Sequence, residues 1–339
     1  MMTLPQFLEI PATAHSAESD TLAAQQGFVS ALKDLSLIQV SGDDAASYLH
    51  NLLSNDIEHL TLTSARHAAL CTPKGRMLAS FFIWKTSDGI FLQLSASILA
   101  PVQKRLQMFV MRAKAKLNDV STEYTALGLG GLAATKTLLQ WFPQLPSEVN
   151  GKVDTEFGSL IRVSDAYGHA RYLWIIQSTM LNEYWPVLQS SLTPCSAALW
   201  RRTDIMAGIA RIIDKTQEQF VPQMVNFELI GGINFKKGCY PGQEIVARSQ
   251  YLGKLKRRMA IASIPSTAVM AGMEVFSEED PDQPCGMIVN AEADNSDSSI
   301  CLVELKVADQ EANKVHLGAA DGAPLHFLPL PYAMLDVTQ

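Results

Sequence analysis

The 339-residue chain has few of the features that mark metal-binding, secreted and membrane proteins. Its five cysteines form no Cys-x-x-Cys pair, which argues against a zinc site, a conventional cluster-binding motif and a disulfide framework. The seven histidines show no metal-ligand spacing, so we expect no bound metal. No run of about 18 apolar residues exists, which argues against a membrane-spanning helix. The start continues through Glu9 and Asp20 without a basic segment and an apolar core, so we expect no secretory signal and a cytoplasmic protein.

The chain also has no excess of positive charge. Its 27 basic and 34 acidic residues give a net charge of −7, so direct nucleic-acid binding is not expected. Between residues 236 and 258, however, Glu244 is the one acid among seven basic residues: Lys236, Lys237, Arg248, Lys254, Lys256, Arg257 and Arg258. Such a run is more often a solvated face than a binding site. A role for this run in binding the phosphates of a nucleic acid is less favoured than a solvated face, because few aromatic residues alternate with the charges to stack bases.

The most informative segment lies inside this basic stretch and reads KKGCYPGQE over residues 236–244. It puts the thiol of Cys239 between lysines and a predicted helix start, and such neighbours lower a thiol pKa from about 8.5 to roughly 3.5–7.5. Gly238 and Gly242 are expected to adopt backbone angles that a Cβ forbids, and Glu244 falls in the first helical turn. The alternative stays open, because a lone cysteine is more often a small buried apolar residue.

Apolar periodicity predicts strands and helices in a mixture that is typical of an α+β fold of antiparallel sheets covered by helices. Strands are expected at 35–40, 67–71, 77–84, 90–94, 123–129, 159–164 and 171–177, and helices near 49–53, 99–110, 132–141 and 181–190. From Arg258 onward, short apolar runs at 259–264, 286–289 and 300–305 predict a small β-barrel or sandwich. Residues 278–282 and 294–299 are expected to be exposed loops. The side chains assigned to packing are Cys71, Trp84, Trp174, Trp200 and Cys301.

Residues 237–244 resemble the Lys-Gly-Cys-Tyr-x-Gly-Gln-Glu signature of the YgfZ family, with one free position. The approach to this signature and two upstream motifs resemble the same family, at residues 220–224, Asn226, 231–235, 41–45 with 49–56, and 71–76. The resemblance implies a multi-domain ring like that of the glycine-cleavage T-protein, in which antiparallel sheets with helices are followed by a C-terminal β-barrel. The domains expected from it are a lead-in at 1–26, a folate-binding core of two interleaved α+β subdomains at 27–253, and the barrel at 254–339.

The resemblance also implies a function. It predicts a tetrahydrofolate-binding accessory protein that supports assembly or repair of iron–sulfur clusters in client enzymes, including a tRNA-modifying one. Folate and those enzymes are the expected partners, and no membrane is expected. The site residues that it implies are Cys239 and Lys237 for the thiol chemistry, and Lys236, Lys237, Gly238, Tyr240, Gln243, Glu244, Lys74, Arg76 and Asp204 for folate, whose glutamate carboxylates suit lysine and arginine.

Two departures from the aminomethyltransferase relatives bear on the mechanism. Ala79 stands where those enzymes place the aspartate that assists one-carbon transfer, so this chain lacks an acid or base there. Met206 stands where they have a glutamate that hydrogen-bonds the pterin ring, and a thioether cannot pair with the ring's donors. A tetrahydrofolate-dependent aminomethyltransferase or demethylase is therefore the alternative function, and a scaffold that binds no folate is a third.

Overall fold

The computed structural model describes residues 17–251 and 255–334. Of the lead-in expected at residues 1–26, the first 16 residues lie outside this described part. The chain forms two compact units, each assembled from three stretches of sequence. Unit 1 consists of the described residues of Met1–Ala46, His59–Arg66 and Phe82–Thr203. Unit 2 consists of those of Ser47–Glu58, His67–Phe81 and Asp204–Gln339.

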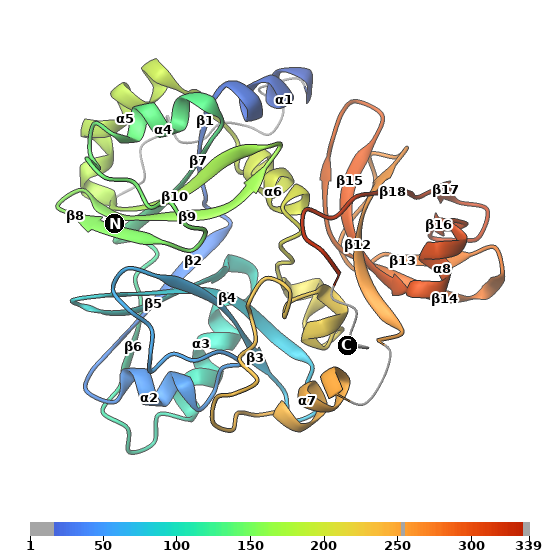
Figure 1. Ribbon diagram of the computed structural model, residues 1–339, viewed down its shortest axis with the longest axis horizontal. Helices are drawn as coiled ribbons and strands as arrows, with labels where there is room; N and C mark the ends of the chain where they lie inside the picture. The colour runs from blue at the N-terminus through green and yellow to red at the C-terminus, as the bar shows by residue number, and fades with distance from the viewer. Residues whose placement is uncertain (1–16, 252–254, 335–339) are drawn as a thin grey trace. The chain divides into compact units, whose positions relative to one another are not determined.

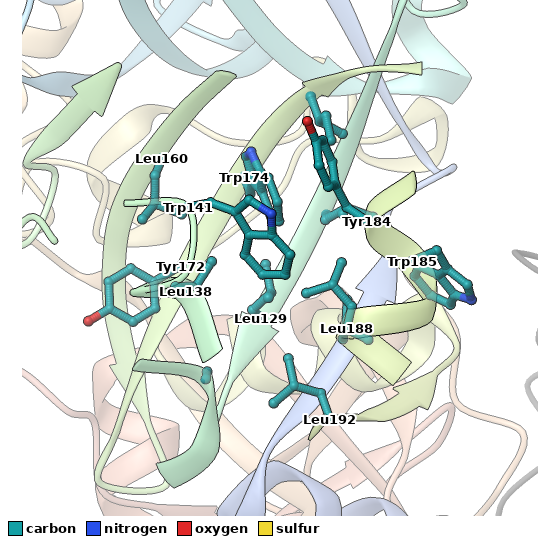
Figure 2. Close-up of a cluster of buried hydrophobic side chains, with 14 of the residues drawn as sticks. Leu129, Leu138, Trp141, Leu160, Tyr172, Trp174, Tyr184, Trp185, Leu188 and Leu192 are labelled. Atoms are coloured by element: carbon teal, nitrogen blue, oxygen red, sulfur yellow. The ribbon is translucent and has the colours of Figure 1, made fainter. Parts of the chain in front are cut away.

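A six-stranded sheet organises unit 1. Its strand order is β11 (Thr193–Cys195), β1 (Phe28–Ala31), β7 (Tyr124–Gly130), β10 (His169–Gln177), β9 (Gly158–Ala166) and β8 (Lys152–Thr155). All neighbouring pairs are antiparallel except β1 and β11. Three helices of the same unit are α1 (Ala17–Gln26), α4 (Leu132–Leu138) and α5 (Leu181–Ser191). Figure 2 shows how Trp141, Tyr184 and Leu188 meet Trp174 of β10 in one apolar core.

A second sheet has the strand order β3 (Ala65–Cys71), β4 (Met77–Thr86), β5 (Gly89–Ser95), β2 (Leu35–Ser41) and β6 (Lys116–Asp119). Two helices lie between strands of this sheet in the sequence. Helix α2 (Ala45–His50) lies between β2 and β3, and helix α3 (Leu99–Met108) lies between β5 and β6. Strand β4 is buried along its first eight residues, as its apolar run predicts. Helix α6 (Ala197–Met206) follows the last strand of unit 1.

The C-terminal part of unit 2 is a seven-stranded antiparallel sheet that curls into a barrel-like form (Figure 1). Its strand order is β17 (Ala323–Pro324), β16 (Val315–Leu317), β13 (Glu274–Ser277), β14 (Asp280–Ala293), β15 (Ser299–Lys306), β12 (Arg257–Ile264) and β18 (His326–Leu328). Short helices α7 (Gln243–Tyr251) and α8 (Val307–Ala312) precede and interrupt it. The α+β class and the C-terminal barrel are confirmed.

Most strands and helices expected from periodicity are present within a few residues of their predicted positions. Cys71, Trp84, Trp174, Trp200 and Cys301 are all buried, as predicted. Two local predictions were wrong. Helix α2 ends at His50 although the apolar spacing continues to Leu53. Residues 280–282 begin β14 instead of extending a loop, because β13 and β14 form a hairpin in which Ser277 pairs with Asp280.

Candidate functional site

The thiol segment is held by a close backbone contact at Gly242, immediately before α7. Gly242 has φ +82°, and a Cβ at this position would lie 2.4 Å from the carbonyl oxygen of Thr72 and 2.7 Å from Cα of Gly75. Only glycine fits, as expected. Glu244 lies in the first turn of α7, which confirms that prediction. The prediction that Gly238 also needs a backbone conformation forbidden to other residues was wrong. Gly238 has no positive φ, and a Cβ there would make only an ordinary contact with His50.

The turn that Gly242 contacts carries Lys74 and Arg76. Thr72 N–H donates to Arg76 O (2.8 Å) and Gly75 N–H donates to Thr72 O (2.9 Å), which closes the turn between β3 and β4. The guanidinium of Arg76 donates to the carbonyl oxygen of Gln219. Lys74 is exposed and has no hydrogen-bond or ion-pair partner among the described residues. The structure therefore brings the Lys74 turn to the start of α7, within unit 2.

Other residues of the family-like motifs act as supports for this segment. The fully buried amide of Gln223 donates to Val246 O of α7 at 2.7 Å. Ser54 Oγ donates to Gly232 O at 2.7 Å, and Asn55 Nδ2 donates to Gly231 O at 2.7 Å. These bonds fix the stretch that leads into the signature, so that the thiol segment lies on a rigid base.

Cys239 is the exposed cysteine of the chain, and the other four are buried. Burial raises the pKa of Cys71, Cys195 and Cys301 to about 12, and that of Cys285 to about 11. A thiol that is both buried and protonated at neutral pH is a poor nucleophile. Thiol chemistry at the surface is therefore concentrated at Cys239.

Lys237 is half-buried next to this thiol. Its ammonium donates to His50 O (2.5 Å) and Gly238 O (3.2 Å), and lies 4.9 Å from the centroid of the buried Tyr240 ring. Burial lowers the pKa of Lys237 to about 8, while the carboxylates of Asp56 and Glu58 act in the opposite direction. The amine therefore links the signature to the end of α2.

Asp204 is held by a different interaction. Its carboxylate accepts a hydrogen bond from Arg211 Nη2 at 2.6 Å, with both side chains largely buried. The same carboxylate acts on His67, whose pKa burial lowers to about 4. Ala79 is fully buried in β4, and Met206 is partly buried at the end of α6. In the signature, Gln243 N–H donates to Tyr240 O at 3.1 Å.

The basic stretch at 236–258 divides into paired and unpaired cations. Arg257 forms a two-bond pair with Glu304, and Arg258 of β12 pairs with Glu228, which precedes the signature in the chain. Lys254 lies outside the described residues. Within this stretch, the cations that are exposed and have no ion-pair partner among the described residues are Lys236, Arg248 and Lys256. Lys74, on the turn that Gly242 contacts, is a further cation of this kind. The available positive charge is thus smaller than the sequence count indicated.

Sequence reasoning missed His50 and Asp56 as neighbours of the segment that carries the thiol. Both residues stand in an N-terminal motif that shows no link to residue 239 in the sequence. In the structure, Lys237 bonds directly to the carbonyl of His50, and Asp56 bonds to the His50 ring. A charged residue six positions after a histidine gives no signal of such a long-range contact.

A separate cavity of about 250 Å³ lies in unit 1. It is lined by aromatic side chains that include Trp84, Phe91 and Tyr124, and by the carboxylates of Asp88 and Asp154. None of the predicted site residues lies on it. Over residues 17–251 and 255–334, no cluster of three or more His, Cys, Asp or Glu side chains is arranged to hold a metal ion. Over the same residues, no helix is long and apolar enough to cross a membrane.

Comparison with known proteins shows that the fold has a known architecture. Residues 11–156 match the family model described as the GCVT N-terminal domain. The glycine cleavage system aminomethyltransferase T from Bartonella henselae superposes with a TM-score of 0.74 at 15% identity, over 94% of this chain and 89% of that chain. The chain has a T-protein-like fold. The heterotetrameric sarcosine oxidase from Corynebacterium sp. U-96 matches at a TM-score of 0.37 and 12% identity, over 54% of this chain and 94% of that chain.

Proposed function

We propose that this protein is a folate-binding accessory protein that supports assembly or repair of iron–sulfur clusters in client enzymes, tRNA-modifying enzymes among them. One observation carries the proposal. In a T-protein-like fold, Cys239 is exposed at the start of α7 by a turn whose backbone tolerates only glycine at residue 242. A thiol fixed in this way is suited to reaction with a partner, since it is preorganised and accessible.

Tetrahydrofolate is the proposed ligand, and the chain offers groups for one end of it. The unpaired ammonium groups of Lys74 and Lys236 suit the carboxylates of a folate glutamate tail. Asp204 forms an ion pair with Arg211, so its carboxylate is already occupied in part. Met206 offers the pterin ring no strong acceptor. Recognition of the tail by cations is therefore the stronger part of the fit.

The alternative function, a tetrahydrofolate-dependent aminomethyltransferase, finds less support at the chemical level. Ala79 is fully buried in β4 and supplies no group for proton transfer. Turnover of a methylamine-type substrate with tetrahydrofolate by the purified protein would favour the transferase over the accessory role.

Calorimetric titration with tetrahydrofolate tests the ligand. We expect saturable micromolar binding that weakens at least about tenfold in the Lys74→Ala, Lys236→Ala double variant, because two charged contacts are lost. The matched control is Lys104→Ala, Lys136→Ala, which removes two exposed lysines from helices α3 and α4. Absence of binding by the wild type would remove folate from the proposal. Equal weakening in the control would show that only net charge matters.

Complementation tests the role of the thiol. In cells that lack the protein, activity of an iron–sulfur enzyme should be restored by the wild type and by Arg248→Ala, a change at an exposed position of α7. It should not be restored by Cys239→Ala, whose folded amount is checked by immunoblot. Full restoration of the enzyme's activity by Cys239→Ala would contradict the proposed role of the thiol.

A further inference from the structure

His50 at the end of α2 is part of an ordered pair that faces the thiol segment. Its ring Nδ1 lies 3.1 Å from Asp56 Oδ1, and the two side chains are 10% and 15% exposed. Glu58 is more distant, with its Oε2 4.0 Å from the same nitrogen. Asp56 is in turn positioned by its backbone N–H, which donates to Asn55 Oδ1 at 2.8 Å. A carboxylate at Nδ1 places the ring proton on Nδ1, which leaves Nε2 as the acceptor.

The other ring nitrogen points at the thiol segment. A Cβ built on Gly238 would lie 3.7 Å from His50 Nε2, with no other atom within 4 Å. Among the described residues, Nε2 has no hydrogen-bond partner, although nine-tenths of the side chain is buried. Nε2 is not one of the buried polar atoms that lack a partner, so this nitrogen is open to solvent and available as an acceptor. Its free position faces the residue that immediately precedes Cys239.

Lys237 connects the end of α2 to the loop that carries the thiol. Its ammonium donates to His50 O and to Gly238 O, so the lysine spans the end of α2 and the thiol loop. Asp56 and Glu58 act electrostatically on this ammonium, and Cys239 lies close enough to do so as a thiolate. The charged groups that face His50 are therefore Asp56, Glu58 and Lys237, all within unit 2.

We propose that His50, oriented by Asp56, is the proton acceptor of Cys239 and makes this thiol a nucleophile for soft electrophiles such as a disulfide. The proton on Sγ passes to Nε2, which leaves a thiolate beside an imidazolium whose charge Asp56 balances. The thiolate attacks one sulfur of the disulfide, so that one S–S bond forms and another breaks. The leaving thiolate takes up the proton from Nε2. The step needs no external oxidant.

This inference rests on the proposed function only in taking Cys239 as the working thiol. Gly238 gives it an additional structural probe. A Cβ at 3.7 Å from Nε2 is in ordinary contact, so Gly238→Ala fits without steric strain. The added methyl group would nevertheless occupy the space in front of Nε2. Gly238→Ala should therefore slow the thiol reaction while leaving the fold unchanged.

The test is the rate at which iodoacetamide alkylates Cys239 in the full-length protein, followed by peptide mass spectrometry from pH 5.5 to 9.5. At pH 7, His50→Gln should react at least about tenfold more slowly than the wild type, since an unassisted thiol with a pKa of about 8.5 is only a few per cent ionised. Gly238→Ala and Asp56→Asn should be slower in the same direction. At pH 9.5 all rates should converge, because the thiol then ionises without help.

A structural effect of these substitutions would change the rate at every pH alike, so the convergence at high pH separates the two cases. Unchanged rates and pH profiles in both His50→Gln and Gly238→Ala would overturn the inference. If His50→Gln fails to fold, Gly238→Ala decides the question alone. The assay contains neither folate nor a client enzyme, so a failed complementation with a reactive thiol would count against the proposed function and not against His50.

Discussion

Replacement of Gly242 by alanine should destabilise unit 2 by an amount that the geometry allows us to separate into two parts. The left-handed backbone at φ +82° costs a residue with a Cβ about 1–2 kcal/mol. Overpacking costs about 1–3 kcal/mol more, because the atoms met at 2.4–2.8 Å belong to the backbone of Thr72 and Gly75 and cannot rotate away. Restriction of the unfolded chain returns about 0.4–1 kcal/mol. The expected net loss is about 1–5 kcal/mol, with a central value of about 3 kcal/mol.

Two other glycines of unit 2 separate these parts experimentally. Gly231 has φ +73°, but a Cβ at this position would meet no atom within 4 Å, so Gly231→Ala carries the backbone cost alone, about 1 kcal/mol. Gly238 has neither a positive φ nor a close contact, so Gly238→Ala should be nearly neutral. The difference between Gly242→Ala and Gly231→Ala measures the packing of the Thr72 turn against α7.

Hydrogen exchange resolved by mass spectrometry is the suitable assay. All five tryptophans lie between residues 82 and 203, in unit 1, so intrinsic fluorescence does not report on unit 2. The opening free energies of unit 2 peptides should be highest in Gly238→Ala, lower in Gly231→Ala and lowest in Gly242→Ala. Equal values for Gly231→Ala and Gly242→Ala, within about 0.5 kcal/mol, would refute the claim that backbone contact fixes the thiol loop.

Three further predictions concern charged groups of unit 2. Arg258→Met should lower the free energy of unfolding by about 3–5 kcal/mol, because it leaves Glu228 buried and unpaired. Adding Glu228→Met should recover much of this loss, and no recovery in urea titrations would contradict the prediction. Burial lowers the pKa of His67 to about 4 from 6.5, so stability present above pH 6.5 should be lost as the pH falls toward 4, and His67→Gln should flatten that loss in thermal melts. The pKa of Lys237 is lowered to about 8 from 10.5, so between pH 8 and 10.5 the unfolded state binds more protons than the folded state. The stability of the wild type relative to Lys237→Met should therefore rise across this pH range, and a stability difference that does not change with pH would contradict the prediction.

The secondary structure was largely predictable because short apolar runs alternate with turn residues throughout the chain. The signature was also predictable, since its turn and the start of α7 are neighbours in sequence. The loop expected at residues 278–282 is confirmed at 278–279, which form an exposed turn between β13 and β14, and was wrong at 280–282. Asp280 and Asp282 resemble residues of a solvated loop, but they lie in β14, which pairs with β13 through register shifts near Phe276. A hairpin strand at the surface can carry such charges.

The candidate site was predictable only where it is local. His50 bonds to a residue 187 positions later in the chain, and no periodicity reports a contact of that span. The basic stretch was overcounted for a related reason, because Arg257 and Arg258 find their acidic partners on other strands and loops of unit 2. Charge in a sequence is a count, whereas charge at a surface depends on which pairs form.

The division of each unit into three stretches of sequence has a consequence for how the protein is made. Residues 47–58 and 67–81 leave the ribosome early, yet they belong to the unit whose remaining part starts at Asp204 and is complete only near the C-terminus. At about 5–20 residues per second, these segments wait roughly 10–50 s for their partners. During that time the apolar first half of β4 has no finished core to join, so the nascent chain should need protection by chaperones. His50 and the segment that carries Cys239 can come together only after both have been synthesised.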